Sequence, residues 1–211
     1  MIGNFLLLFA LAGVYFTFAP VIKAEFFYRK DQVQNKKYIV AGDQIGSLPA
    51  GRQVNLLKIE KPLEISPIST DFGLVIPKIN ANAVVVSNVD AGDKKAYLTA
   101  LKTGVAHALG TALPGEVGNT YLFAHSVGNF WEINQWNAVF YLLRELVPGD
   151  EVDIFYKNKR YIYVVYDKKI VEPNETGYLE AITDFPRLTL QTCWPPGTTL
   201  KRLLVFGRLK I

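Results

Sequence analysis

The hydrophobic positions of the chain follow two patterns, and the change from one to the other comes near residue 70. Residues 5–22 form one uncharged, almost continuous apolar run. A helix rises about 1.5 Å per residue, so this run would cover most of a hydrocarbon core about 30 Å thick. From residue 71 onward the apolar residues gather in short segments rich in β-branched and aromatic side chains. The first pattern predicts a membrane-spanning helix, and the second predicts a β-rich domain.

Residues 1–25 are expected to form an uncleaved membrane anchor, with a cleaved signal peptide and a buried helix as the alternatives. A signal peptide needs a basic start and a small-x-small site after its apolar region, but Ala10-Leu11-Ala12 lies inside the run and no basic residue precedes it. Lys23, Arg29 and Lys30 all follow the run. By the positive-inside tendency, these charges favour a cytoplasmic C-terminal domain.

The rest of the chain divides into a linker and one domain. Residues 26–70 are polar, contain several Gly and Pro and show weak periodicity, which predicts a linker. Residues 71–211 predict a single mainly β domain, either a barrel or a sandwich. Strands are expected at residues 74–76, 83–86, 121–124, 152–156, 161–166, 188–192 and 203–206. Helices are expected at residues 93–102 and 137–146, and a hairpin turn at residues 157–160.

Composition narrows the possible functions. An apolar fraction of 50% with 20% charged residues is typical of a globular protein with one membrane-length segment. The formal charge of +4 comes from scattered lysine pairs without an interleaved aromatic stripe, so no nucleic-acid partner is expected. A single cysteine excludes an intramolecular disulfide framework and the usual cysteine-based zinc clusters. We expect no metal and no cofactor.

The single cysteine, Cys193, stands at the end of a β-type segment and is followed by a Pro-Gly turn and then by Arg202. If the two flanking segments pair antiparallel, Cys193 and Arg202 become cross-strand or diagonal neighbours, with Cβ atoms about 5–8 Å apart. Strand alternation places Thr189 and Gln191 on the same face as Cys193. A free cysteine is usually a buried, inert side chain. In this setting, however, the pattern indicates a nucleophilic thiol beside a cation.

Thiol chemistry also needs a group that accepts and returns a proton, and the chain has two histidines, His107 and His125. His125 follows the apolar segment 121–124 and precedes a flexible segment, which places it at a strand end where sites are commonly built. His107 follows a predicted helix end, which favours a structural or groove-lining role. We therefore expect His125 to be the catalytic histidine.

Several motifs occur in the order in which the sortases carry them, and residues 72–209 strongly resemble that family of bacterial membrane-anchored cysteine transpeptidases. The matching stretches are residues 76–79, 104–107, 110–115, 123–126, 139–141, 148–152, 189–193, 196–198 and 202–203. The resemblance implies a mainly β fold, an eight-stranded sortase-type β-barrel with short helices, preceded by one N-terminal transmembrane helix. It also implies that His125, Cys193 and Arg202 are the catalytic residues.

The resemblance implies a function as well. The chain would cleave an LPXTG-like sorting signal through a thioester acyl-enzyme and transfer the protein to an amine acceptor, either a cell-wall peptide or a pilin lysine. Thr192, Trp194 and His107 are expected to bind the substrate. The protein would be a single-pass protein of the cell membrane, with its catalytic domain extracytoplasmic. The charges that follow the apolar run favour the opposite orientation, and we follow the resemblance of the domain on this question. The short interval between Cys193 and Arg202 is similar to the non-housekeeping branches of the family.

Other classes fit the sequence less well. A papain-like protease places its cysteine before its histidine, in a Cys-Gly-x-Cys-Trp context, whereas here the histidine comes first. L,D-transpeptidases usually carry a histidine two residues before the nucleophile, where this chain has Gln191. Two alternatives stay open: a non-enzymatic surface β-barrel that binds peptides, and a sortase-like peptidase that releases its product to water.

Overall fold

A computed structural model of the chain describes residues 2–42, 62–126 and 139–210. The helices are α1 (Ile2–Val33) and α2 (Lys94–Thr103), with the 3-10 turns η1 (Pro77–Ile79), η2 (Tyr141–Glu145) and η3 (Thr176–Tyr178). The strands are β1 (Tyr38–Val40), β2 (Leu63–Ile65), β3 (Phe72–Ile76), β4 (Ala81–Val89), β5 (Val105–Ala108), β6 (Gly118–Phe123), β7 (Glu151–Tyr156), β8 (Lys159–Val171), β9 (Pro186–Trp194) and β10 (Lys201–Leu209).

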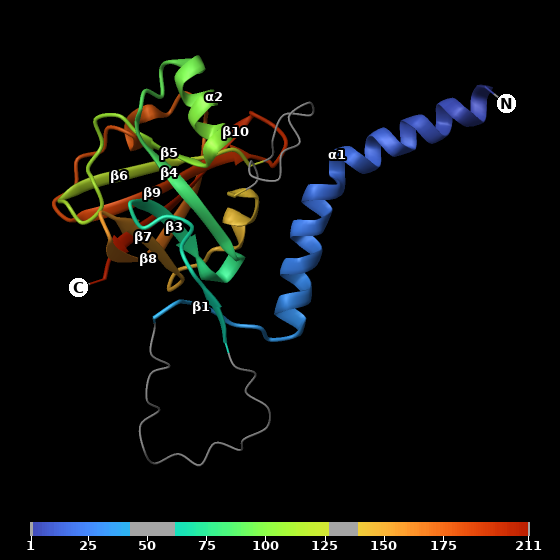
Figure 1. Cartoon of the computed structure of the whole chain (residues 1–211). Coiled ribbons are helices and arrows are strands. Elements are labelled where there is room, and N and C mark those ends of the chain that lie inside the picture. Colours follow the sequence, from blue (N-terminus) through green and yellow to red (C-terminus); the bar gives the residue numbers. More distant parts are fainter. Residues whose placement is uncertain (1, 43–61, 127–138, 211) are drawn as a thin grey trace, which may run out of the picture.

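Strands β3 to β10 close into a barrel in the order β10-β8-β7-β3-β4-β5-β6-β9 (Figure 1). Most neighbours are antiparallel, but β4 pairs with β5 and β6 pairs with β9 in parallel. Helix α2 is the crossover between β4 and β5, and it contacts both strands. The predicted mainly β fold, with a closed eight-stranded barrel and a few short helices, is confirmed.

Apolar side chains from alternate positions fill the barrel. In β9, Leu188 and Leu190 are 0% and 1% exposed and belong to the central core, together with Leu122 of β6 and Val205 of β10, which are the neighbours of Leu190 across the ladders. The intervening positions of β9 point to the outer face. At the C-terminal end of the strand this outer face is partly exposed, and Cys193 lies there. The interior leucines thus decide the side of the barrel on which the thiol lies.

The local predictions largely match the described elements. Each of the seven expected strands coincides with a strand between β3 and β10. Helix α2 begins after Asp93, whose carboxylate accepts hydrogen bonds from the N–H groups of Lys95 and Ala96. Lys157 and Asn158 have φ values of 49° and 61°, the geometry of a tight two-residue hairpin.

Two local predictions need correction. Strand β5 was not expected from the sequence, because its four residues are too few to show a period of two. The helix expected over residues 137–146 is only the 3-10 turn η2, while residues 137 and 138 lie outside the described residues. The apolar side chains of this turn, Leu142 and Leu143, are buried against the barrel. This tertiary packing stabilises a turn that is too short to be stable as an isolated helix.

The N-terminal helix α1 includes the apolar run 5–22. Within the described ranges, no helix combines the length and the hydropathy needed to cross a membrane. The second half of α1 contacts the domain through Glu25, which forms an ion pair with Arg144 of η2. Glu25 also forms an ion pair with Arg29 within the helix. Tyr28 packs against the barrel core beside this contact.

Part of the predicted linker, residues 26–70, packs on the outer face of the barrel. Strands β1 and β2 pair in parallel as a small separate sheet. Val40 and Ile65 from this sheet are buried against Val75 and Phe155 of the barrel. Residues 43–61 of the same segment lie outside the described residues.

Leu204 of β10, which is buried on the face it shares with Gln191, offers a test of the packing around the barrel. Replacing Leu204, which is 1% exposed, with Ala should lower the free energy of unfolding by about 2–5 kcal/mol, because it removes buried methyl groups and leaves a cavity. Chemical denaturation followed by circular dichroism measures this change. The matched control is Leu200→Ala in the β9–β10 turn, where Leu200 is 67% exposed. Equal losses for the two variants would contradict the assignment of Leu204 to the core.

Candidate active site

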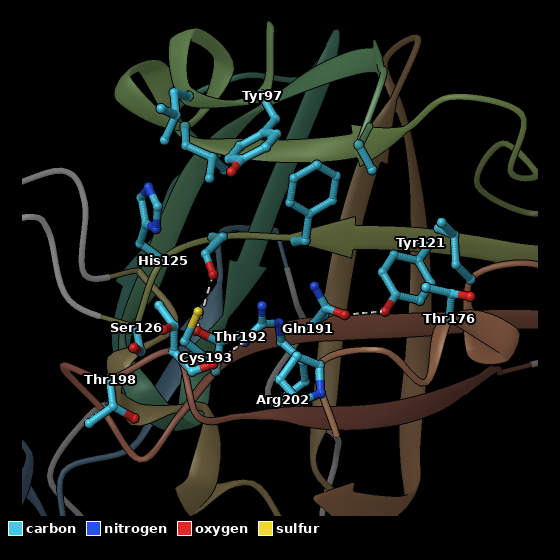
Figure 2. Close-up of a pocket in the computed structure, with 18 of the residues that line it drawn as sticks. Tyr97, Tyr121, His125, Ser126, Thr176, Gln191, Thr192, Cys193, Thr198 and Arg202 are labelled. Carbon is cyan, nitrogen blue, oxygen red and sulfur yellow. Dashed lines mark hydrogen bonds between the residues drawn. The ribbon is translucent and has the colours of Figure 1, made fainter. Parts of the chain in front are cut away.

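A pocket of about 630 Å³ opens beside the C-terminal ends of β6 and β9, with α2 forming the wall opposite (Figure 2). Cys193, His125 and Arg202 all line it. They come from β9, from the residues that follow β6, and from β10, respectively. Three side chains from separate stretches of sequence therefore face one cavity.

Cys193 and Arg202 are directly opposed partners in the antiparallel β9–β10 ladder. The cross-strand arrangement expected from their spacing is confirmed. The Nη1 group of Arg202 donates to the carbonyl oxygens of Thr199 and Lys201, each at 3.1 Å. A guanidinium is planar and presents five N–H donors, so these two bonds fix the orientation of the whole group.

His125 reaches the pocket because the residue before it is fixed to β9. The N–H of Ala124 donates to the carbonyl oxygen of Gln191 at 3.1 Å. The hydroxyl of Thr192 donates to the carbonyl oxygen of Ala124 at 3.0 Å. These bonds extend the parallel β6–β9 pairing by one residue and place His125 next to the segment that holds Cys193. In Figure 2 the imidazole and the sulfur face the same cavity.

The comparison with protein families agrees with this fold. A family model described as the sortase domain matches residues 74–210. The chain belongs to the sortase family. Among curated relatives it is similar to Sortase D of Bacillus subtilis (strain 168), with 29% identity over 138 residues. That match covers 64% of this chain and 61% of Sortase D, so the chain spans about six tenths of that relative's length.

Solved sortase structures share the barrel. Sortase C1 of GBS Pilus Island 1 superposes with a TM-score of 0.57 at 27% identity, covering 66% of this chain and 64% of that one. Clostridium perfringens sortase C, solved with the C-terminal cell wall sorting motif, superposes with a TM-score of 0.54 at 28% identity, covering 66% of this chain and 69% of that one. Cys193, His125 and Arg202 all lie within the residues that the family model matches.

The three residues predicted to bind substrate in this sortase lie in different surroundings. Thr192 lines the pocket but is only 3% exposed, and its hydroxyl is used to hold Ala124. Trp194 is partly buried against the barrel core and is not among the described residues that line the pocket. His107 is 0% exposed in β5 and is also not among those residues.

The structure does not support a substrate-binding role for His107. Its Nδ1 accepts a hydrogen bond from the N–H of Asn88 at 3.3 Å. Its Nε2 lies 3.2 Å from the carbonyl oxygen of Ala112 and 3.0 Å from the hydroxyl of Thr111. Because Nδ1 accepts, the proton belongs on Nε2, which donates to Ala112. A ring with both nitrogens engaged and no exposed surface cannot contact a peptide in the pocket.

Sequence reasoning missed most of the pocket wall. Lys94, Tyr97, Leu98 and Leu101 of α2 line it, and their spacing of three and four residues places them on one face of the helix. Their periodicity was visible in the sequence. The sequence did not show which strand ends these residues cover, because their position depends on how α2 crosses between β4 and β5.

The buried His107 should make this sortase less stable in mild acid. Burial lowers the pKa of His107 below its ordinary value, against the opposing effects of the Ala112 hydrogen bond and the Glu116 charge. Above the unfolded pKa of about 6.5 both states are neutral and His107 adds no pH dependence. As the pH falls below that value, the unfolded state gains a proton that the folded state resists, so stability falls.

The test compares free energies of unfolding at pH 7.5 and pH 5 for the wild type and for His107→Gln. The loss between the two pH values should be smaller in the variant, because glutamine does not titrate. A His125→Gln variant is the matched control for removing a histidine from the pocket. An identical pH dependence in the wild type and His107→Gln would show that His107 is not held neutral.

Proposed function

We propose that the chain is a cysteine transpeptidase that cleaves an LPXTG-like sorting signal and transfers the acyl part to an amine on the cell surface. The acceptor is a cell-wall peptide or a pilin lysine. The observation that carries this proposal is the convergence of Cys193, His125 and Arg202 on one pocket. Membership of the sortase family supports it.

The chemistry proceeds in two steps that share the same groups. The Cys193 thiolate attacks the carbonyl carbon before the final glycine of the signal, and a carbon–sulfur bond forms. The carbon–nitrogen bond then breaks as His125 gives a proton to the leaving amine. In the second step His125 takes a proton from the incoming amine, which attacks the thioester. The new amide forms and the Cys193 thiolate is released.

Arg202 stabilises the charge that develops between these steps. Attack converts the substrate carbonyl into a tetrahedral oxyanion, which needs hydrogen-bond donors. Arg202 lies directly across the ladder from Cys193 and is always charged, so it can donate a charge-assisted hydrogen bond to that oxyanion or to the substrate backbone. Its fixed orientation means that little reorganisation accompanies the reaction.

The proposal extends to location and organisation. Residues 1–25 anchor the protein in the membrane through the uncharged run 5–22, residues 26–70 connect the anchor to the catalytic domain, and residues 71–211 form that domain outside the membrane. A substrate on the cell surface is supported by the similar Clostridium perfringens sortase C, which was solved with a C-terminal cell wall sorting motif.

Mass spectrometry tests the acyl-enzyme directly. The full chain is incubated with a library of peptides of the form Leu-Pro-X-Thr-Gly, with and without candidate amines. Wild-type protein should gain the mass of the acyl fragment, and Cys193→Ala should gain none. A product joined to the amine indicates transpeptidation, and a free acid indicates a peptidase. Binding without any adduct would refute the enzyme proposal and leave a peptide-binding barrel.

Arg202→Lys should lower kcat/KM for peptide cleavage by about 100-fold or more, because lysine keeps the charge but loses the planar, oriented donors. The matched control is Arg208→Lys on the same strand, where the guanidinium lies 4.0 Å from the centre of the Phe185 ring and does not line the pocket. Near-wild-type kcat/KM for Arg202→Lys would remove Arg202 from the mechanism.

The two histidines should differ sharply in the same cleavage assay. His125→Gln should reduce kcat by about 100- to 10,000-fold, since general acid–base catalysis typically contributes that factor. His107→Gln should keep much of the rate, because His107 is buried outside the pocket. The opposite ranking would exchange their roles.

A further inference from the structure

A polar pair lies on the pocket wall next to the thiol. The hydroxyl of Tyr121 donates a hydrogen bond of 2.6 Å to Oε1 of Gln191 (Figure 2). Both residues line the pocket. Tyr121 comes from β6 and Gln191 from β9, and the parallel pairing of these strands holds the two side chains together. The proposed chemistry gives this pair no role so far.

The hydrogen bond fixes which end of the Gln191 amide faces the cavity. Tyr121 is 4% exposed, and burial raises the pKa of its hydroxyl against the opposing charges of Arg202 and Arg187, so the phenol keeps its proton and acts as the donor. Oε1 of Gln191 is thereby occupied as an acceptor. Among the described residues, none accepts a hydrogen bond from Nε2 of Gln191, and that group can serve a ligand in the pocket.

The spacing along β9 matches that of an extended peptide. Gln191 precedes Cys193 by two residues on the same face of the strand, a separation of about 6.6–7 Å. In an extended peptide, carbonyl groups two residues apart point to the same side with that same separation. When one carbonyl lies at the sulfur, another can therefore lie at Gln191.

The direction of the peptide follows from the position of His125. The leaving amine must be near His125 to receive its proton, so the leaving half lies on that side of the thiol. In Figure 2 the Cys193 sulfur lies between His125 and the Tyr121–Gln191 pair. The half that stays bound as the thioester therefore extends past Gln191.

We propose that Nε2 of Gln191 binds the backbone carbonyl two residues before the scissile one, and that Tyr121 is a positioning residue that orients the Gln191 amide. This inference rests on the proposed transpeptidase function. This hydrogen bond contacts only the backbone of the acyl half. It therefore favours an extended conformation of the peptide, whatever side chains the signal carries. It holds the acyl half in place while the leaving amine is exchanged for the acceptor.

The test uses Gln191→Leu and Tyr121→Phe, with Tyr166→Phe on β8 as the control for losing a hydroxyl outside the pocket. The substrate is a Leu-Pro-X-Thr-Gly peptide that forms the thioester. A second version carries an E-alkene in place of the peptide bond that contains the proline carbonyl. Steady-state cleavage gives KM and kcat, and iodoacetamide alkylation of Cys193 measures thiol reactivity without any peptide.

Gln191→Leu should lower kcat/KM for the normal peptide by about 3- to 10-fold, mainly through KM, with a smaller loss for Tyr121→Phe and none for Tyr166→Phe. The alkene peptide should lose a similar factor with wild-type protein, and Gln191→Leu should add no further loss. Alkylation rates should be unchanged in all three variants.

Two results would overturn the proposal while leaving the transpeptidase function in place. One is unchanged kinetics in Gln191→Leu. The other is a loss of the same size on both peptides, because the effect would then not pass through that carbonyl. A change in alkylation rate equal to the loss in kcat/KM would also overturn it, since the residue would then act on the thiol. Absence of any thioester with wild-type protein would overturn both proposals.

Discussion

Strand β9 is hydrogen-bonded to β6 on one side and to β10 on the other, and the geometry of the pocket depends on both pairings. The β10 pairing places Arg202 opposite Cys193. The β6 pairing, extended by the two hydrogen bonds to Ala124, brings the following His125 to the same end of the sheet. A shift of one residue in either register would turn a functional side chain to the opposite face of the barrel. The register is held by the interior, where Leu188 and Leu190 are almost completely buried.

The two pairings differ in how well the sequence predicts them. Cys193 and Arg202 are joined by a short turn, so their cross-strand contact follows from spacing and alternation alone. The neighbourhood of His125 depends on a parallel pairing between strands far apart in the chain, and no local pattern encodes it. In the sequence it was supported by the family resemblance and by the position of His125 at a strand end.

The differences between the predicted and the observed surroundings of the site have the same physical origin. His107 was expected to have a structural or groove-lining role because it follows a predicted helix end, and it lies in β5, between β4 and β6 in the closed barrel. A segment of four residues is too short to show the alternation of a strand. The burial of a histidine depends on contacts with residues far away in the sequence, which the local sequence does not predict. The wall contributed by α2 was missed for a related reason. The helix itself was predictable, whereas its position over the strand ends is a property of the crossover.

The alternation of β9 also separates stability from chemistry. The inward positions are leucines whose volume the core requires, and cavities there would cost several kcal/mol. The outward positions near the thiol, Gln191 and Cys193, are only partly buried and contribute mainly to the pocket. Thr192 is the exception, because it points inward but uses its hydroxyl to hold Ala124 in place. A chain with this arrangement can change what the outer face binds while its inner face stays the same, because each residue of one strand faces only one of the two environments. The hydrogen bond from Thr192 to Ala124 links the packing of β9 to the catalytic site, because Ala124 directly precedes His125.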